Sequence, residues 1–313
     1  MIEECHGKKL AMTSGEKAIN RLIWNETNYS ELRRVSLKRI FLVGSGVMSL
    51  GIAQIFLEKN FEVILYSRDN ERLIEFKKKL MKIFIEKAKY TKEISELLME
   101  KLFCTTDLLE AKSADLVIEA IVEDIDIKKE LFKKLDEICK ENVIFSTNTS
   151  SLSITEIAAV TSRPEKFIGM HFFNPASLMK LVEIIKGIFT SDETIDKIKE
   201  IIFKLKKEHI IVEEIPGFLV NRILIPMIND SINLLEQKVA TKEDIDKAMK
   251  FGANHPIGPL QLSDLIGNDV VLGIMNTLYR ETKDNKYRPA YLLKKYVSSG
   301  LLGRKVKKGF YTY

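Results

Sequence analysis

The sequence predicts an α/β protein in which a doubly wound, mostly parallel sheet is followed by an all-helical domain. Short apolar runs alternate with helical patterns up to about residue 215, as expected when helices cover both faces of a parallel sheet. The patterns after the PGF triplet at 216–218 are helical only, and all seven prolines lie at or after Pro164. These observations indicate two domains with a boundary near Pro216.

The first strand is predicted at KRIFLVG (38–44), an apolar run that is closed by glycine and is typical of a buried strand. A helical pattern at 47–60 and a second strand at 61–66 follow. A Lys-rich helical region then extends to about residue 100. The remaining strands are expected at 114–121, 143–149, 167–173, 181–185 and 209–215, with a helix at 126–140.

The second domain is predicted to be built from helices at roughly 218–236, 242–250, 261–282 and 288–298. The chain is therefore expected to contain a polar N-terminal extension (1–35), a sheet domain (36–215) and a helical domain (216–313).

The composition is that of a globular protein, with 45% hydrophobic and 30% charged residues. The net charge of +5 is mild for 313 residues, so nucleic acid is not an expected partner. Cys5, Cys104 and Cys139 are far apart and form no CxxC motif, which argues against a disulfide framework or a metal site and fits a reducing cytoplasm. No apolar run approaches the ~18 residues of a membrane span, and residues 1–35 lack the apolar core of a secretion signal.

A glycine-rich loop, GSGVMSLG, joins the first strand to the first helix. Gly44 and Gly46 fit the first two positions of a GxGxxG motif, and Val47 and Met48 open the helix whose N-terminus can bind a pyrophosphate. Ser49 replaces the third glycine and is expected to crowd the cofactor side slightly. The motif favours a Rossmann-type dinucleotide site over a plain strand–turn–helix.

The end of the second strand bears on the choice of cofactor. An acidic residue is expected there to bind the ribose 2′-hydroxyl, but the sequence has Ser67 and Arg68. A guanidinium can pair with a 2′-phosphate, so the interpretation is NADP in preference to NAD. Two alternatives stay open: Arg68 is a surface arginine or stacks on adenine, or Asp69 or Glu71 supplies the carboxylate.

Four polar residues stand in apolar or tight surroundings. His171 ends an apolar strand and can move protons near neutral pH, and Glu183 lies within another apolar strand and is a natural partner for it. Ser150 follows the strand at 143–149, and Asn221 follows the domain junction; both can hydrogen-bond an oxygen. The alternatives are a satisfied core histidine, a surface carboxylate paired with a nearby lysine, and ordinary capping residues.

The run at 77–92 holds seven lysines and one glutamate. Such a run is usually the solvated face of a helix, but it could also receive the phosphates of an anionic substrate such as a coenzyme A thioester.

The chain resembles the L-3-hydroxyacyl-CoA dehydrogenase family, and within it the bacterial 3-hydroxybutyryl-CoA dehydrogenases, from about Lys38 to Tyr313. The resemblance rests on the motifs GSGVMSLGIAQ, DLVIEAIVED, STNTSSLSITEIA, GMHFFNPASLMKLVEII, PGFLVNRILIPMIND, EDIDKAMKFGANHPIGPLQLSD and GRKVKKGFYTY. It implies a dinucleotide-binding domain, a helical domain for substrate binding and dimerisation, a homodimer, and reversible hydride transfer between NAD(P) and C3 of an acyl-CoA thioester.

The resemblance also implies roles for individual residues. His171 is similar to the family's proton acceptor, Glu183 to its orienting partner, and Ser150 and Asn221 to the residues that hold the substrate oxygen. The positions that match cofactor contacts are Glu123, Lys128, Asn148, Asn174 and Lys305. The candidates for the acyl-CoA lysine are Lys82, Lys87 and Lys89.

Two other functions remain open. A dehydrogenase of related fold that acts on a free hydroxy acid or sugar acid would not need coenzyme A. A non-catalytic cofactor-binding protein would have no reason to keep His171, Glu183, Ser150 and Asn221 together.

Overall fold

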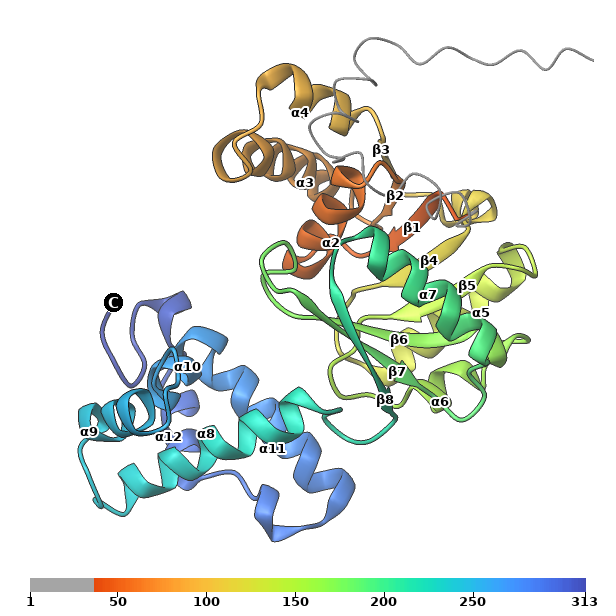
Figure 1. Cartoon of the computed structure of the whole chain (residues 1–313). Coiled ribbons are helices and arrows are strands. Elements are labelled where there is room, and N and C mark those ends of the chain that lie inside the picture. Colours follow the sequence, from red (N-terminus) through yellow and green to blue (C-terminus); the bar gives the residue numbers. More distant parts are fainter. Residues whose placement is uncertain (1–36) are drawn as a thin grey trace, which may run out of the picture. The chain divides into compact units, whose positions relative to one another are not determined.

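The computed structural model describes residues 37–313, so the extension predicted at 1–35 lies outside the described residues. The described chain forms two compact units (Figure 1). The first runs to Asn148 and resumes at Glu156–Ile211, whereas the second combines Thr149–Thr155 with Val212–Tyr313. The fold class predicted from the sequence, an α/β sheet followed by helices, is confirmed.

The first unit is built around an eight-stranded sheet with the order β3-β2-β1-β4-β5-β6-β7-β8. The pairs from β3 to β6 are parallel, and β6 and β7 are antiparallel. The strands are β1 Arg39–Val43, β2 Glu62–Tyr66, β3 Leu102–Thr105, β4 Leu116–Glu119, β5 Ile144–Thr147, β6 Phe167–Phe172, β7 Leu181–Lys186 and β8 Glu208–Glu213. Because β1 lies between β2 and β4, the strand order reverses there, which is the place where such sheets bind nucleotides.

Helices cover both faces of the sheet (Figure 1). On one face, α2 (Val47–Glu58), α3 (Asn70–Lys82) and α7 (Asp192–Lys204) pack their apolar residues against strand residues such as Ile40 and Leu42. On the other face, α5 (Ile125–Ile138) places the Phe132 ring 4.6 Å from that of Phe167, centroid to centroid. The central strands, such as β1, β4, β5 and β6, are therefore buried on both sides, which explains the continuous apolar runs in the sequence.

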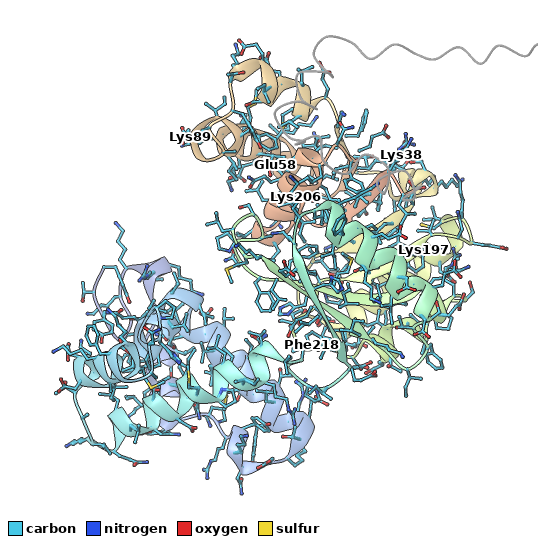
Figure 2. All side chains as sticks on the ribbon, in the orientation of Figure 1. Lys38, Glu58, Lys89, Lys197, Lys206 and Phe218 are labelled. Atoms are coloured by element: carbon cyan, nitrogen blue, oxygen red, sulfur yellow. The ribbon has the colours of Figure 1, made fainter. Side chains whose placement is uncertain are left out.

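The Lys-rich region is less regular than the sequence predicts. It contains α3, a π-helix at Ile83–Lys87, a turn in which Lys89 has φ 60°, and α4 (Lys92–Met99). Lys89 is labelled in Figure 2. Thr91 ends the turn by accepting a hydrogen bond from the backbone N–H of Ile94, so α4 starts as a separate helix.

The second unit is helical. Its helices are α8 Val220–Glu236, α9 Lys242–Lys247 with a π-helical turn at Ala248–Gly252, α10 Pro259–Ile266, α11 Asn268–Thr282 and α12 Tyr291–Ser298. The single helix expected at 261–282 is wrong, because Gly267 has φ 107° and separates α10 from α11. Short elements elsewhere are α6 Ile154–Ala158 and 3₁₀ turns at Leu108–Ser113, Pro164–Lys166, Asn285–Tyr287 and Arg304–Val306.

The C-terminal segment closes the helical unit through two buried carboxylates. Asp264 accepts hydrogen bonds from the backbone N–H groups of Phe310 and Tyr311, both at 2.9 Å. The Tyr311 hydroxyl donates to Asp246 over 2.9 Å. Burial and this hydrogen bond raise the pKa of Tyr311, so the phenol stays protonated and keeps donating.

Candidate active site

His171 and Glu183 form a buried pair across two antiparallel strands. The register of β6 and β7 places the two residues directly opposite each other. His171 Nδ1 lies 2.6 Å from Glu183 Oε2, and the two residues are 6% and 0% exposed. The partnership that the sequence suggested is therefore present, since a cross-strand pair shares one face of the sheet.

This pair can carry proton transfer. A neutral imidazole that donates its Nδ1 proton to a carboxylate leaves Nε2 as the proton acceptor. Glu183 stabilises the imidazolium once Nε2 is protonated, and holds the ring in one orientation. The ring of Phe173 packs against that of His171, with 4.6 Å between the centroids, and further restricts it. This geometry suits a general acid–base.

The loop between β1 and α2 has the features of a phosphate site. Gly44 has φ 115°, and a Cβ atom there would lie 2.5 Å from the carbonyl oxygen of Ala120, so a larger residue does not fit. At Gly46 no atom lies within 4 Å of where a Cβ would be, which leaves room for a ligand. No side chain caps the first turn of α2, where Val47 is 71% exposed and Met48 is half-buried. These features fit a pyrophosphate at the helix N-terminus.

Ser49, which replaces the third glycine of the motif, borders the glycine loop: a Cβ at Gly44 would lie 3.2 Å from its hydroxyl. It is fully buried, and its hydroxyl lies 3.4 Å from the carbonyl oxygen of Ala120 at the end of β4. Gly51 has a separate role in packing, because a Cβ there would lie 3.0 Å from that of Ala176.

At the end of β2, the guanidinium of Arg68 stands next to Asp69, whose carboxylate caps α3. Ser67 follows β2, and Arg68 is exposed. Asp69 caps α3 by accepting hydrogen bonds from the backbone N–H groups of Glu71 (2.9 Å) and Arg72 (3.2 Å). The carboxylate that could have replaced the usual acidic residue thus serves the helix.

Ser150 and Asn221 both belong to the second unit, whereas His171 and Glu183 belong to the first. Ser150 lies in a turn in which Thr149 Oγ1 accepts a hydrogen bond from the N–H of Leu152 over 2.9 Å. Asn221 is half-buried in the first turn of α8. The two segments of the second unit are joined by Glu214, which accepts hydrogen bonds from the backbone N–H and the hydroxyl of Thr155.

The candidates for cofactor contact at the end of β4 lie around a residue that sequence reasoning missed. Lys128 is 1% exposed, and its Nζ lies 2.6 and 2.8 Å from the two carboxylate oxygens of Glu119 and 3.6 Å from Glu123. Glu119 stands in the apolar run DLVIEAI. A carboxylate in an apolar strand is the signal that singled out Glu183, and it would also have identified Glu119.

The other cofactor candidates are more dispersed. Asn148 follows β5, and its side-chain oxygen accepts a hydrogen bond from the N–H of Phe172 over 2.9 Å, next to His171. Asn174 is exposed after β6 and is joined to Pro175 by a cis peptide bond. Lys305 lies in the second unit, where its Nζ is 2.5 Å from Asp269.

One of the three lysine candidates for acyl-CoA binding lies on a groove of about 920 Å³ beside α3 and α4. Lys82 lines this groove and lies 3.8 Å from Glu86. Lys89 is exposed in the turn before α4, and Lys87 ends the π-helix. The groove is lined by Lys77, Lys78, Met81, Lys82, Ile85, Glu86, Glu96, Met99 and Glu100. Three lysines and three glutamates balance in charge, so the groove itself is not a strong anion site.

Residues 37–313 contain no cluster of three or more histidine, cysteine, aspartate or glutamate side chains that could hold a metal ion. In the same range, no helix combines the length and the apolar character needed to cross a membrane.

Comparisons with known proteins agree on one family. Residues 39–215 match the NAD binding domain of 3-hydroxyacyl-CoA dehydrogenase, and residues 217–313 match its C-terminal domain. The 3-hydroxybutyryl-CoA dehydrogenase of Clostridioides difficile is 50% identical over 278 residues, covering 88% of this chain and 99% of the relative. The human mitochondrial hydroxyacyl-coenzyme A dehydrogenase is 38% identical over 299 residues, covering 92% and 95%. The crystal structure of (S)-3-hydroxybutyryl-CoA dehydrogenase PaaH1 from Ralstonia eutropha superposes with a TM-score of 0.83 at 42% identity, covering 89% and 99%.

Proposed function

This chain belongs to the 3-hydroxyacyl-CoA dehydrogenase family, and from that membership we propose that it interconverts 3-hydroxybutyryl-CoA and acetoacetyl-CoA. The reaction is an oxidoreduction at a CH–OH group. The similarity to relatives that are named for the four-carbon substrate supports the short-chain assignment. The observation that carries the proposal is the buried His171–Glu183 pair, because a general acid–base is what the reaction needs besides a nicotinamide.

In the reducing direction, a nicotinamide cofactor held at the glycine loop would supply the hydride for C3 of the substrate. His171, protonated at Nε2, donates its proton to the 3-oxygen as negative charge develops on it. Glu183 stabilises the imidazolium before this transfer and keeps Nδ1 engaged. Ser150 and Asn221, which match the family's residues that hold the substrate oxygen, are our candidates for that role. In the oxidising direction, neutral His171 would accept the proton from the 3-hydroxyl, and the oxidised nicotinamide would take up the hydride from C3.

For the cofactor, the match to an NAD binding domain supports nicotinamide binding at the glycine loop, with Gly44, Gly46, Val47 and Met48 at the pyrophosphate. We propose NADP(H) as the preferred form. Arg68 is exposed where the 2′-position of the adenosine ribose is expected, and Asp69 is committed to capping α3. Arg68 offers a guanidinium that can pair with a 2′-phosphate, although the nearby carboxylates of Asp69 and Glu71 keep their negative charge.

The test is steady-state reduction of acetoacetyl-CoA with NADPH and with NADH. We expect turnover with both and a higher kcat/KM for NADPH, and we expect Arg68→Ala to remove the preference by raising KM for NADPH alone. Arg72→Ala is the matched control, because Arg72 is a neighbouring exposed arginine on α3. A preference for NADH in the wild type would overturn the NADP assignment.

The same assay separates the alternative functions. A dehydrogenase of free acids would reduce acetoacetate as well as its thioester, whereas the proposed enzyme requires coenzyme A. A cofactor-binding protein without activity would bind NADPH or NADH and turn over neither substrate. Lys82, Lys87 and Lys89 are the proposed acyl-CoA contacts, so their replacement by alanine is expected to raise KM for acetoacetyl-CoA and leave that for the cofactor unchanged.

We also propose a cytoplasmic homodimer. The exposed apolar residues of the helical unit support it; they include Ile223, Phe251, Leu265 and Tyr291. Sedimentation equilibrium is expected to give twice the mass of the 35.9 kDa chain.

A further inference from the structure

We propose that Glu119 is a positioning residue of the cofactor site, which it organises by holding Lys128, and through it Glu123, at the end of β4. This proposal rests on the proposed function in one respect, namely that a nicotinamide cofactor binds at this edge of the sheet. It adds a residue to which the sequence analysis gave no role.

The carboxylate of Glu119 accepts four hydrogen bonds inside the first unit. Its side chain is 0% exposed. Oε1 accepts hydrogen bonds from the backbone N–H of Ile121 (2.7 Å) and from Lys128 Nζ (2.6 Å). Oε2 accepts from Lys128 Nζ (2.8 Å) and from the hydroxyl of Thr147 (2.6 Å). One carboxylate thus joins β4, β5, α5 and the loop that follows β4.

The segment that Glu119 holds borders the candidate phosphate site. Ala120 donates its N–H to the carbonyl of Val43 over 2.9 Å, and its own carbonyl oxygen limits the side chain at position 44 to glycine. The backbone carbonyl of Glu119 accepts the N–H of Asn148 over 2.7 Å. A shift of Glu119 would therefore move the neighbours of the glycine loop.

Stability alone does not explain why two charged residues, Glu119 and Lys128, are buried together. A buried ion pair loses so much hydration that apolar residues of similar volume are usually at least as stabilising. Lys128 is almost completely buried, yet its ammonium lies 3.6 Å from Glu123, whose side chain is 37% exposed. Glu119 therefore fixes the position of Lys128, and Lys128 in turn attracts the carboxylate of Glu123. Solvent, and hence a ligand, can reach that carboxylate.

The experiment compares three variants with the wild type by calorimetric titration with NADH and with NADPH, alongside thermal unfolding. Glu119→Gln keeps the shape of the side chain but leaves the Lys128 charge buried without its partner. Glu119→Gln with Lys128→Met removes both charges and restores a neutral interior. Asp136→Asn is the matched control, because it breaks a largely buried ion pair, Asp136 to Arg163 at 2.7 Å, between α5 and the segment before β6.

We expect Glu119→Gln to lower Tm and to raise the Kd for the cofactor by roughly tenfold or more, the size of one lost charge-assisted hydrogen bond. The double variant is expected to recover most of the Tm and to keep the raised Kd, because Lys128, itself a candidate cofactor contact, is lost and Glu123 no longer has an ammonium 3.6 Å away. Asp136→Asn is expected to lower Tm and to leave Kd unchanged.

A double variant that regains both the wild-type Tm and the wild-type Kd would overturn the proposal, since the pair would then be structural only. An unchanged Kd in Glu119→Gln would do the same. A wild-type chain that binds the cofactor without reducing acetoacetyl-CoA would contradict the proposed function alone, and the titrations would still decide the role of Glu119. A wild type that binds neither NADH nor NADPH would overturn both.

Discussion

Glu183 and Glu119 are both fully buried carboxylates on one face of the same sheet, yet they hold different partners. The strand register places Glu119, Thr147, His171 and Glu183 on this common face. Glu119 accepts hydrogen bonds from the ammonium of a lysine, and Glu183 lies against the ring of a histidine. In the proposed mechanism, a proton moves only at the second pair.

The difference shows how a buried carboxylate acquires a role from its partner. Glu119 receives four hydrogen bonds from the backbone, a hydroxyl and an ammonium, which lock its surroundings. Glu183 orients one nitrogen of a ring whose other nitrogen can act on a substrate. Changes at the His171–Glu183 pair should therefore alter the reaction rate. Changes at the Glu119–Lys128 pair should alter stability and cofactor affinity.

The largest expected effect is on rate at the histidine. His171→Gln is expected to lower kcat by ~10²–10⁴-fold, because glutamine cannot act as an acid–base. Its amide can still donate to Glu183, so Tm and the Kd for NADPH should stay close to the wild-type values. Steady-state and calorimetric measurements check this; near-normal kcat would remove His171 from the mechanism.

The next effect is on stability at the lysine. Lys128→Met leaves the carboxylate of Glu119 buried without its cation and is expected to lower the free energy of unfolding by about 3–5 kcal/mol. Lys134→Met breaks an ion pair on the exposed side of the same helix, Lys134 to Glu130, and should cause no measurable change. Urea unfolding of both variants tests the contrast, which would fail if the two midpoints coincided.

A smaller effect is expected from Thr147→Val, which removes one of the four hydrogen bonds to Glu119 and preserves the shape of the side chain. The free energy of unfolding should fall by about 1–2 kcal/mol, since a buried acceptor loses a partner. Chemical denaturation measures this; a neutral result would mean that Lys128 and Ile121 alone satisfy the carboxylate.

The smallest effect concerns the neighbouring hydroxyl on the opposite face. Ser146 is fully buried, and its hydroxyl has no hydrogen-bond partner among the described residues. Ser146→Ala is expected to be neutral or to stabilise the protein by up to about 1 kcal/mol, because an unsatisfied buried hydroxyl costs free energy. A clear loss of stability in the same denaturation experiment would show that the hydroxyl is satisfied after all.

The sequence predicted most of the sheet because buried parallel strands are continuous apolar runs. It missed β3, of which only Leu102 is buried, and α7, to which no pattern drew attention. It also joined α10 and α11 into one helix, since a single glycine in a helical pattern does not reveal a φ of 107°. Local backbone conformation at Gly267 and Lys89 depends on surroundings that composition does not encode.

At the candidate site, the sequence predicted which polar residues matter, but it predicted only some of the contacts between them. A histidine and a glutamate in two apolar strands suggested a pair, but the register of β6 and β7 is what makes them opposite each other. Asp69 could be named as a carboxylate, but its use as a helix cap follows from where α3 begins. The interactions of Glu119 join residues up to 28 positions apart, and periodicity cannot show contacts of that range.

The two outer strands of the sheet have a consequence for how copies of this chain behave in a crowded solution. In the described residues, β3 and β8 end the sheet, and an outer strand offers unpaired backbone groups to any other strand it meets. β3 has only four residues, and β8 carries the exposed charges Glu208 and Glu213. Because of the short length of one outer strand and the like charges on the other, we expect strand-to-strand association between copies of the chain to be disfavoured.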